Sequence, residues 1–192
     1  MDAVMNRLDF PCVIETIKGV IHQMARPNLN HIKASGKLYW LFMNYFIKYE
    51  CELLAEPLVR LDDDEVVPDI CVVCDKTKLK RTRIVGAPDL IIEILSPSTR
   101  KKDIEEKYPL YEKHGVREYW LVDPTVGSVE IYVLGSDGKY EIPRSYPFQT
   151  EEEKKDLIKY GRAHAIVEEL SSVIFPELTI QLSELFSYIE QV

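Results

Sequence analysis

The run Leu90–Leu95 is the feature that most constrains the fold of this chain. Its residues are apolar on both faces of an extended strand, except at Glu93. A strand of this kind is typical of the centre of a sheet that helices cover on each side. An unpaired carboxylate is costly to bury, so Glu93 requires a partner, and we expect that partner to belong to a functional site.

Periodic segments on either side of this strand predict an α/β fold. Alternation, capping residues and turn residues mark the expected elements. These are a strand pair turning near Gly19, a helix over 31–50, strands over 51–61 and 66–74 joined by an acidic turn, a helix over 100–114 closed by Gly115, strands over 118–123, 129–133 and 139–142, an exposed helix or mobile loop over 150–162, and a terminal helix within 171–186.

Length and charge limit the class of protein. A chain of 192 residues with 46% hydrophobic residues is long enough for one well-packed core, so we expect a single domain over 1–192. A net charge of -8 argues against a protein that coats nucleic acid nonspecifically, so any DNA contact must be local. The N-terminus lacks a signal-peptide core and no apolar run reaches about 18 residues, which predicts a soluble cytoplasmic protein without a membrane segment.

The cysteines favour a reducing compartment. The chain has Cys12, Cys51, Cys71 and Cys74, and only the last two are close in sequence. Their spacing of three within an expected strand points the two sulfurs to opposite faces. We therefore expect buried structural thiols rather than a metal or redox pair.

Carboxylates on neighbouring strands predict a metal site. Asp89 and Glu93 share one face of one strand, but four residues of extended chain place them about 13 Å apart. Ligands of a shared Mg²⁺ lie about 2.1 Å from the ion, so Asp69, on the adjacent strand, is the better partner for Glu93. Such oxygen ligands suit a hard cation that also binds phosphate, which favours phosphodiester hydrolysis.

A lysine on the following helix is placed inward by its sequence spacing. At a helical repeat, Lys107 lies between Leu110 and Tyr111 on the apolar side, together with Asp103 and Ile104. The outer side carries Lys101, Lys102, Glu105, Glu106, Glu112 and Lys113. Lys107 can orient the attacking water or stabilise charge on phosphate. It can instead extend its ammonium group to solvent or form a structural salt bridge with Glu93.

These residues carry a resemblance to a known family. The stretches Val67–Ile70, Gly86–Thr99, Asp103 with Lys107, and Tyr111–Pro124 resemble the bacterial Uma family of restriction endonucleases, which has the PD-(D/E)XK nuclease fold. The resemblance is dense over 66–124 and weaker at Glu15–Gly19, His31 and Phe175–Leu178. It implies a restriction-endonuclease-like α/β core with a mixed central sheet flanked by helices.

The resemblance also implies roles for individual residues. Asp69 and Glu93 would be the metal ligands. The chain departs from the general nuclease pattern at Leu95, two residues after Glu93, where a lysine is expected. In this family the lysine lies on the following helix, where Lys107 is found.

Other residues near these positions are candidates for the site or for local structure. His31 is either a capping or core residue of its helix, or it contacts phosphate in the cleft. Asp89 and Asp103 are candidates to orient Lys107 or the metal ligands. Ser96–Thr99 fits a helix cap better than an anion site. The basic run Lys76–Arg83 is either a solvated loop or a contact to the DNA backbone beside the site.

The sequence thus predicts an endonuclease. We expect it to hydrolyse DNA, double-stranded DNA in particular, with Mg²⁺ or Mn²⁺ held by Asp69 and Glu93 and with Lys107 acting on water or on the transition state. Cleavage of both strands of a duplex is easiest with two active sites. A symmetric homodimer would supply them and is therefore expected. The alternative is a noncatalytic nuclease-fold module for binding or assembly, an accessory to a mobile element.

Overall fold

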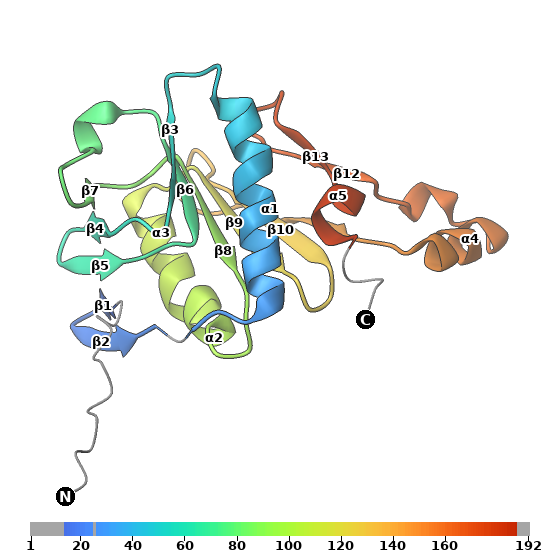
Figure 1. The fold of residues 1–192 in the computed structure, drawn as a ribbon, viewed down its shortest axis with the longest axis horizontal. Helices are drawn as coiled ribbons and strands as arrows, with labels where there is room; N and C mark the ends of the chain where they lie inside the picture. Colours follow the sequence, from blue (N-terminus) through green and yellow to red (C-terminus); the bar gives the residue numbers. More distant parts are fainter. Residues whose placement is uncertain (1–13, 25, 188–192) are drawn as a thin grey trace, which may run out of the picture.

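The computed structural model describes residues 14–24 and 26–187 (Figure 1). Cys12 and the N-terminal segment without a signal-peptide core lie outside the described residues. The strands are β1 (Ile14–Ile17), β2 (Val20–Gln23), β3 (Glu52–Ala55), β4 (Val59–Leu61), β5 (Asp64–Val66), β6 (Ile70–Val73), β7 (Ile84–Val85), β8 (Leu90–Ile94), β9 (Glu118–Asp123), β10 (Ser128–Val133), β11 (Arg144–Pro147), β12 (Glu169–Ser171) and β13 (Thr179–Gln181).

The helices are fewer and mostly short. They are α1 (Leu29–Phe46), α2 (Arg100–Lys102), α3 (Tyr108–His114), α4 (Glu151–Lys159) and α5 (Leu182–Phe186). A π-helical turn, η2 (Asp103–Lys107), joins α2 to α3, and two 3₁₀ turns are η1 (Lys76–Lys78) and η3 (Ala163–Ala165).

A six-stranded mixed sheet forms the centre of the molecule. Its order is β11-β10-β9-β8-β6-β3, in which β8 and β9 are parallel and the other neighbours are antiparallel. All of β8 is buried, as its apolar sequence predicts. Leu90, Ile92 and Ile94 pack in the core that includes α1, whereas Ile91 packs in the core that includes α3. The expected mixed sheet with helices on both faces is confirmed.

The predicted hairpin over 51–74 is present but divided between two sheets. β3 and β6 pair in the central sheet, while β4 and β5 pair in a second sheet of order β2-β1-β5-β4-β7. Each predicted strand is interrupted at a proline, Pro57 or Pro68. Proline cannot donate a ladder hydrogen bond, so the chain leaves one sheet there and joins the other. The second break places Asp69 just before β6.

The N-terminal elements agree with the sequence. β1 and β2 pair antiparallel around a turn in which Lys18 and Gly19 have positive φ. The Asn28 side chain caps α1 by accepting the His31 backbone N–H at 2.9 Å. The helix ends at Phe46, four residues before the predicted end at 50.

The C-terminal third differs from the prediction. Residues 139–142 form only an isolated bridge between Leu134 and Tyr140, and the strand that pairs with β10 is β11. Residues 171–186 form no long helix, because the hairpin β12–β13 precedes the short α5. The segment 150–162 contains the exposed helix α4, which begins with a capping box at Thr150.

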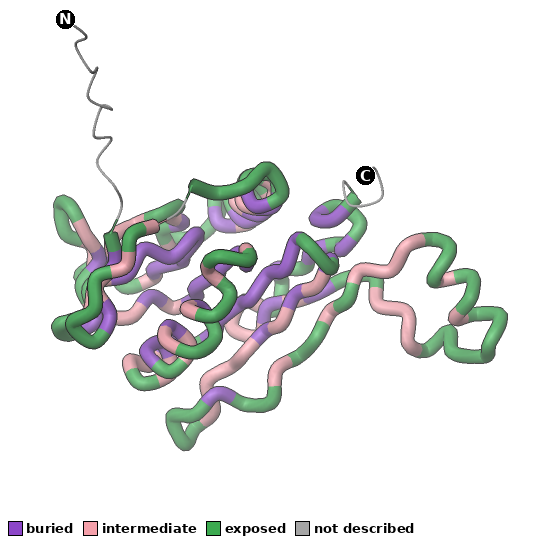
Figure 2. Tube along the Cα trace, turned by 90° about the horizontal axis from the view of Figure 1, so that it is seen from below, coloured by how far each residue is buried: buried purple, intermediate pink, exposed green. Residues whose placement is uncertain are grey.

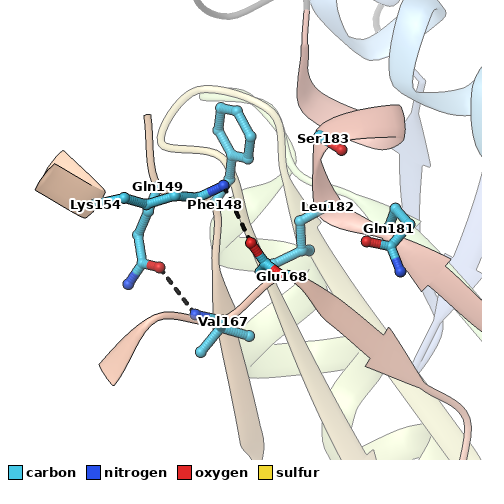
Figure 3. A pocket seen from close by; sticks show the side chains of 8 residues that line it. All are labelled: Phe148, Gln149, Lys154, Val167, Glu168, Gln181, Leu182 and Ser183. Carbon is cyan, nitrogen blue, oxygen red and sulfur yellow. Dashed lines mark hydrogen bonds and ion pairs between the residues drawn. The ribbon is translucent and has the colours of Figure 1, made fainter. Parts of the chain in front are cut away.

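The segment around α4 projects from the body as an arm (Figures 1 and 2). Gln149 closes its base: the side-chain amide donates to the Ala165 carbonyl at 2.9 Å and accepts the Val167 N–H at 2.9 Å. Lys154 lies 3.7 Å from Glu168, and both line a small pocket between the arm and α5 (Figure 3). These contacts fix where the arm leaves the central sheet.

The cysteine prediction was wrong for one pair. Cys51 and Cys74 form a disulfide, which links the chain just before β3 to the chain just after β6, whereas Cys71 is a buried free thiol. Cys71 and Cys74 do lie on opposite faces of the sheet. Disulfides are rare in reducing compartments, so these cysteines no longer support one.

No helix in the described ranges is long and apolar enough to cross a membrane. The single domain over 1–192 and the cytoplasmic location stay predictions.

The C-terminal segment is tied to the central sheet through Glu118. This buried carboxylate accepts the Trp120 indole N–H, the Ser172 hydroxyl at 3.1 Å and the backbone N–H groups of Val173 and Ile174 at 2.9 Å each. One side chain therefore satisfies four donors, one on its own strand and three on a distant segment.

We predict that Glu118→Ala lowers the free energy of unfolding by about 2–4 kcal/mol, because the buried donors lose their acceptor. Urea denaturation measures this. The control is Glu169→Ala on β12, where the side chain is exposed and the change should stay within about 0.5 kcal/mol. Equal effects in the two variants would contradict the assignment.

Candidate active site

Asp69 and Glu93 meet where β6 begins and β8 ends. The antiparallel register pairs Ile70 with Ile92, so the preceding Asp69 lies level with Glu93. The Oδ2 atom of Asp69 accepts the Ile94 N–H at 2.6 Å. Both carboxylates are buried. The structure thus brings together the two predicted metal ligands.

The π-helical turn determines which residues of the following helix face these carboxylates. In this turn the Tyr108 N–H donates to the Asp103 carbonyl, five residues back. Asp103 and Lys107 are each 1% exposed, whereas Ile104, predicted to face inward, is 42% exposed. The regular helical repeat was wrong for Ile104 because the wider turn rotates the residues within it.

Lys107 occupies the centre of a carboxylate cluster. Its Nζ lies 2.8 Å from Glu15 Oε1, 2.9 Å from Glu93 Oε1 and 3.5 Å from Asp103 Oδ1. The ammonium therefore does not reach solvent, which excludes one of the two noncatalytic alternatives. The Tyr111 hydroxyl also donates to Glu93 Oε1, at 2.7 Å.

Glu15 is a site residue that the sequence reading missed. It is fully buried on β1, accepts the Val67 N–H at 2.9 Å and pairs with both Lys102 and Lys107. Lys102 was expected on the outer side of its helix but its side chain is largely buried against Glu15. The available signal was the alternation in β1, which puts Glu15 on the same inward face as Ile17.

His31 joins the cluster from the buried face of α1. Its Nε2 lies 3.1 Å from Asp69 Oδ1. Burial lowers the pKa of His31, but the hydrogen bond to Asp69 and its negative charge outweigh that effect, so the net pKa is raised. The side chain thus holds one oxygen of Asp69 while the backbone of Ile94 holds the other.

Asp89 lies away from this cluster. It directly precedes β8, at the opposite end of that strand from Glu93. Its carboxylate accepts the Cys74 N–H at 2.8 Å, and its Oδ1 lies 3.3 Å from Arg117 Nη1. Four residues of strand separate Asp89 from Glu93 by about 13 Å. The prediction that Asp89 orients Lys107 was wrong, whereas Asp103 contacts it.

The basic run Lys76–Arg83 is also remote. It follows the end of β6, whereas Asp69 precedes its start. Several of its charges have partners in the protein: Lys78 donates to the Ala87 carbonyl at 2.8 Å, and Arg83 pairs with Glu65. Of the two alternatives for this loop, a DNA contact beside the site is contradicted, because the direction of β6 carries the loop to the other end of the sheet.

Ser96–Thr99 gives local structure at the start of α2. The Thr99 side chain makes no capping bond to the helix, but its hydroxyl accepts the Ser96 N–H at 3.3 Å. The segment therefore forms a turn, and the predicted side-chain cap was wrong.

Burial and like charge perturb the titration of the cluster. Burial raises the pKa of Glu93; Lys107 lowers it, Asp103, Asp69 and Glu15 raise it again, and the result is well above the usual range. Burial likewise raises the pKa of Asp103. Burial lowers the pKa of Lys107, but the negative charges of Glu93, Asp103 and Glu15 outweigh that effect. The net pKa is raised, so the amine is protonated at neutral pH.

The donor set fits a hard cation in part. When ionised, the four carboxylates Glu15, Asp69, Glu93 and Asp103 outnumber the two lysines. In the described ranges Asp103 Oδ1 is buried without a hydrogen bond, although it lies 3.5 Å from Lys107 Nζ. In residues 14–24 and 26–187, no three His, Cys, Asp or Glu side chains are close enough to form a ready metal cage. Mg²⁺ commonly uses one or two carboxylates and keeps several waters, so two carboxylates such as Asp69 and Glu93 would be enough.

The chain matches the family model Uma2, described as "Putative restriction endonuclease", over residues 11–166. The chain belongs to the Uma2 family. It is 31% identical over 132 residues to the uncharacterized protein slr1290 of Synechocystis sp., across 67% of this chain and 70% of that protein.

The fold of this Uma2 protein is similar to a crystal structure described as "a putative nuclease belonging to DUF820" from Anabaena variabilis. The TM-score is 0.70 at 21% identity, over 92% of this chain and 90% of the other. A likeness at this identity shows the fold, and it confirms the expected nuclease-like α/β class.

Replacing the central ammonium tests its electrostatic role. We predict that Lys107→Met lowers the free energy of unfolding by about 3–5 kcal/mol at neutral pH, since it leaves buried carboxylates uncompensated. The pKa values of Glu93 and Asp103 are already raised and would rise further. A carboxyl with a raised folded-state pKa stabilises the fold below its unfolded pKa and loses that contribution as pH rises through the folded pKa.

The deficit of Lys107→Met should therefore shrink towards about pH 5 and grow towards about pH 8. Urea titrations of wild type and variant at the two pH values measure it. Lys101→Met, an exposed change six residues earlier, should show almost no deficit at either pH. A deficit that does not depend on pH would contradict this electrostatic account.

Proposed function

We propose that this Uma2 protein is a divalent-metal-dependent endonuclease that hydrolyses phosphodiester bonds of DNA, with double-stranded DNA as its preferred substrate. The observation that carries the proposal is the convergence of Asp69, Glu93 and a buried, charged Lys107 at one end of the central sheet. Membership of a family whose model is described as "Putative restriction endonuclease" supports it.

Asp69 and Glu93 would hold Mg²⁺ or Mn²⁺. The bound ion would supply Lewis-acid polarisation of the phosphate and an acidified water. His31 and the Ile94 N–H fix the two oxygens of Asp69, and Tyr111 fixes Glu93, so both carboxylates are already oriented before substrate arrives.

Lys107 would act as a cation. Because its pKa is raised, it is a poor general base at neutral pH, and its three N–H donors suit orienting water or stabilising charge on the phosphate in the transition state. Glu15 and Asp103 also contact the ammonium, and Lys102 offsets part of the charge of Glu15.

The competing function is a noncatalytic nuclease-fold module that binds DNA or assembles with another protein. Two observations favour it: Leu95 is buried where the general pattern has a lysine, and Lys107 is already paired with Glu93 at 2.9 Å. A saturated salt bridge of this kind can be purely structural. Activity decides between the two functions.

We predict that purified protein converts supercoiled plasmid to nicked or linear DNA with Mg²⁺ or Mn²⁺ and not with a chelator. Asp69→Asn, Glu93→Gln and Lys107→Met should each reduce the rate by about 100-fold or more, the usual scale for an aligned catalytic group. Calorimetry should show weaker Mn²⁺ binding in the first two variants only.

The matched control is Asp89→Asn, the same type of change at the far end of β8. It should leave both cleavage and Mn²⁺ binding close to wild type. Metal-independent cleavage, or equal Mn²⁺ binding by wild type, Asp69→Asn and Glu93→Gln, would remove the proposed site. Absence of cleavage with intact DNA binding would favour the noncatalytic module.

A further inference from the structure

Helix α1 has a second face that the described fold leaves uncovered. Its inner face packs on the central sheet, and Figure 1 shows the helix lying across that sheet. The outer face is exposed and yet apolar. We define the α1 stripe as the exposed nonpolar residues Leu29, Ile32, Gly36, Trp40 and Met43 of α1 together with Ile47, the C-cap residue of the helix.

The α1 stripe is straight and continuous. From 29 to 47 its five steps cover 18 residues, an average of 3.6, which is the repeat of the α-helix, so the side chains lie along one line of about 27 Å. Single exposed apolar residues are normal on a protein surface, but a continuous row of them marks an interaction site. Trp40, in the middle of the row, is 54% exposed.

Gly36 gives an independent indication that something approaches this face. It lies inside α1 without positive φ, and a Cβ added there would meet no atom within 4 Å. Neither backbone conformation nor packing within the described chain requires glycine, although glycine in a helix interior is unfavourable relative to alanine. A close partner outside the described residues explains the missing side chain.

The pattern of the stripe is self-complementary. About a twofold axis at position 38, an antiparallel copy of α1 places Leu29 opposite Ile47 and Gly36 opposite Trp40, with Ile32 and Met43 within one residue of each other. The largest side chain of the row thus falls on its smallest, twice, as an isologous interface requires. A buried tryptophan in a small pocket is a common energetic centre of an interface.

We propose that the α1 stripe is a homodimer interface, in which α1 packs antiparallel against α1 of a second copy of this chain and each Trp40 lies over Gly36 of the partner subunit.

The charged border of the stripe makes the proposal more specific. Lys33 and Lys37 both lie on one side of the row, and Lys37 Nζ is 4.8 Å from the Trp40 ring centroid. A twofold axis at position 38 brings the same side of both helices together, so Lys37 lies close to its copy at the rim. Added salt screens that repulsion and should strengthen the dimer, whereas salt weakens contacts with nucleic acid.

Sedimentation over a concentration series tests the interface without any substrate, so its result is separate from that of the cleavage assay. Wild type should be a dimer at the higher concentrations. Trp40→Glu and Ile32→Glu should each weaken association by about 100-fold or more, the scale of an interface centre. Ile142→Glu, at a site 94% exposed and away from α1, is the matched control and should leave the dimer unchanged.

Two further variants test the pairing of large with small. Gly36→Leu should weaken the dimer, and Gly36→Leu combined with Trp40→Ala should recover part of the loss, because the sizes are exchanged. Gly36→Ala should raise the melting temperature of the monomer while weakening association. A monomer at every concentration, a dimer that survives Trp40→Glu, or a dimer that salt dissociates would overturn the proposal.

Discussion

The salt bridges of the Lys107 ammonium are the interactions on which the rest of the site depends. They join three segments distant in the chain, since Glu15 is on β1, Glu93 on β8 and Asp103 on the π-helical turn. Removing one partner of a buried ion pair costs far more than the intact pair contributes relative to apolar packing. The cluster is therefore weak as a source of stability, and its value lies in fixing charges in one place.

Two irregularities of the backbone create that place. Pro68 interrupts the second strand of the hairpin over 51–74, and the next residue, Asp69, lies just before β6 and beside Glu93. The π-helical turn brings Lys107 and Asp103 inward together. Turns of this kind are frequent at functional sites because they re-aim side chains within a helix. A regular strand and a regular helix would place fewer charges on one point.

The sequence predicts the central sheet and the pair Asp69 and Glu93 because both follow from local pattern. An apolar strand with one carboxylate, and a Pro-Asp pair at a strand start, are visible in a few consecutive residues. Glu15 and Lys102 were missed because their burial depends on contacts between residues 87 apart, which no local period reveals. The basic loop was misplaced for a similar reason: its distance from the site depends on strand direction.

The C-terminal errors have a different physical origin. The apolar residues of 171–186 recur at a spacing that fits a helix, but Glu118 satisfies the backbone N–H groups of Val173 and Ile174 from the central sheet. The Glu118 carboxylate thus takes the place of the backbone carbonyls that would accept these N–H groups in a helix. The disulfide between Cys51 and Cys74 is likewise set by the pairing of β3 with β6, which brings together residues 23 apart.

Helix α1 connects the candidate site to the proposed interface. His31 on its inner face holds Asp69, and the α1 stripe runs along its outer face. Because a helix of this length is stiff, a partner that docks on the outer face also fixes the direction in which the inner face presents the site. A twofold axis through α1 would relate two such sites, and the two strands of duplex DNA are related by the same kind of symmetry. The distance between the two sites would then be set by the packing of the two α1 helices, rather than by a mobile loop.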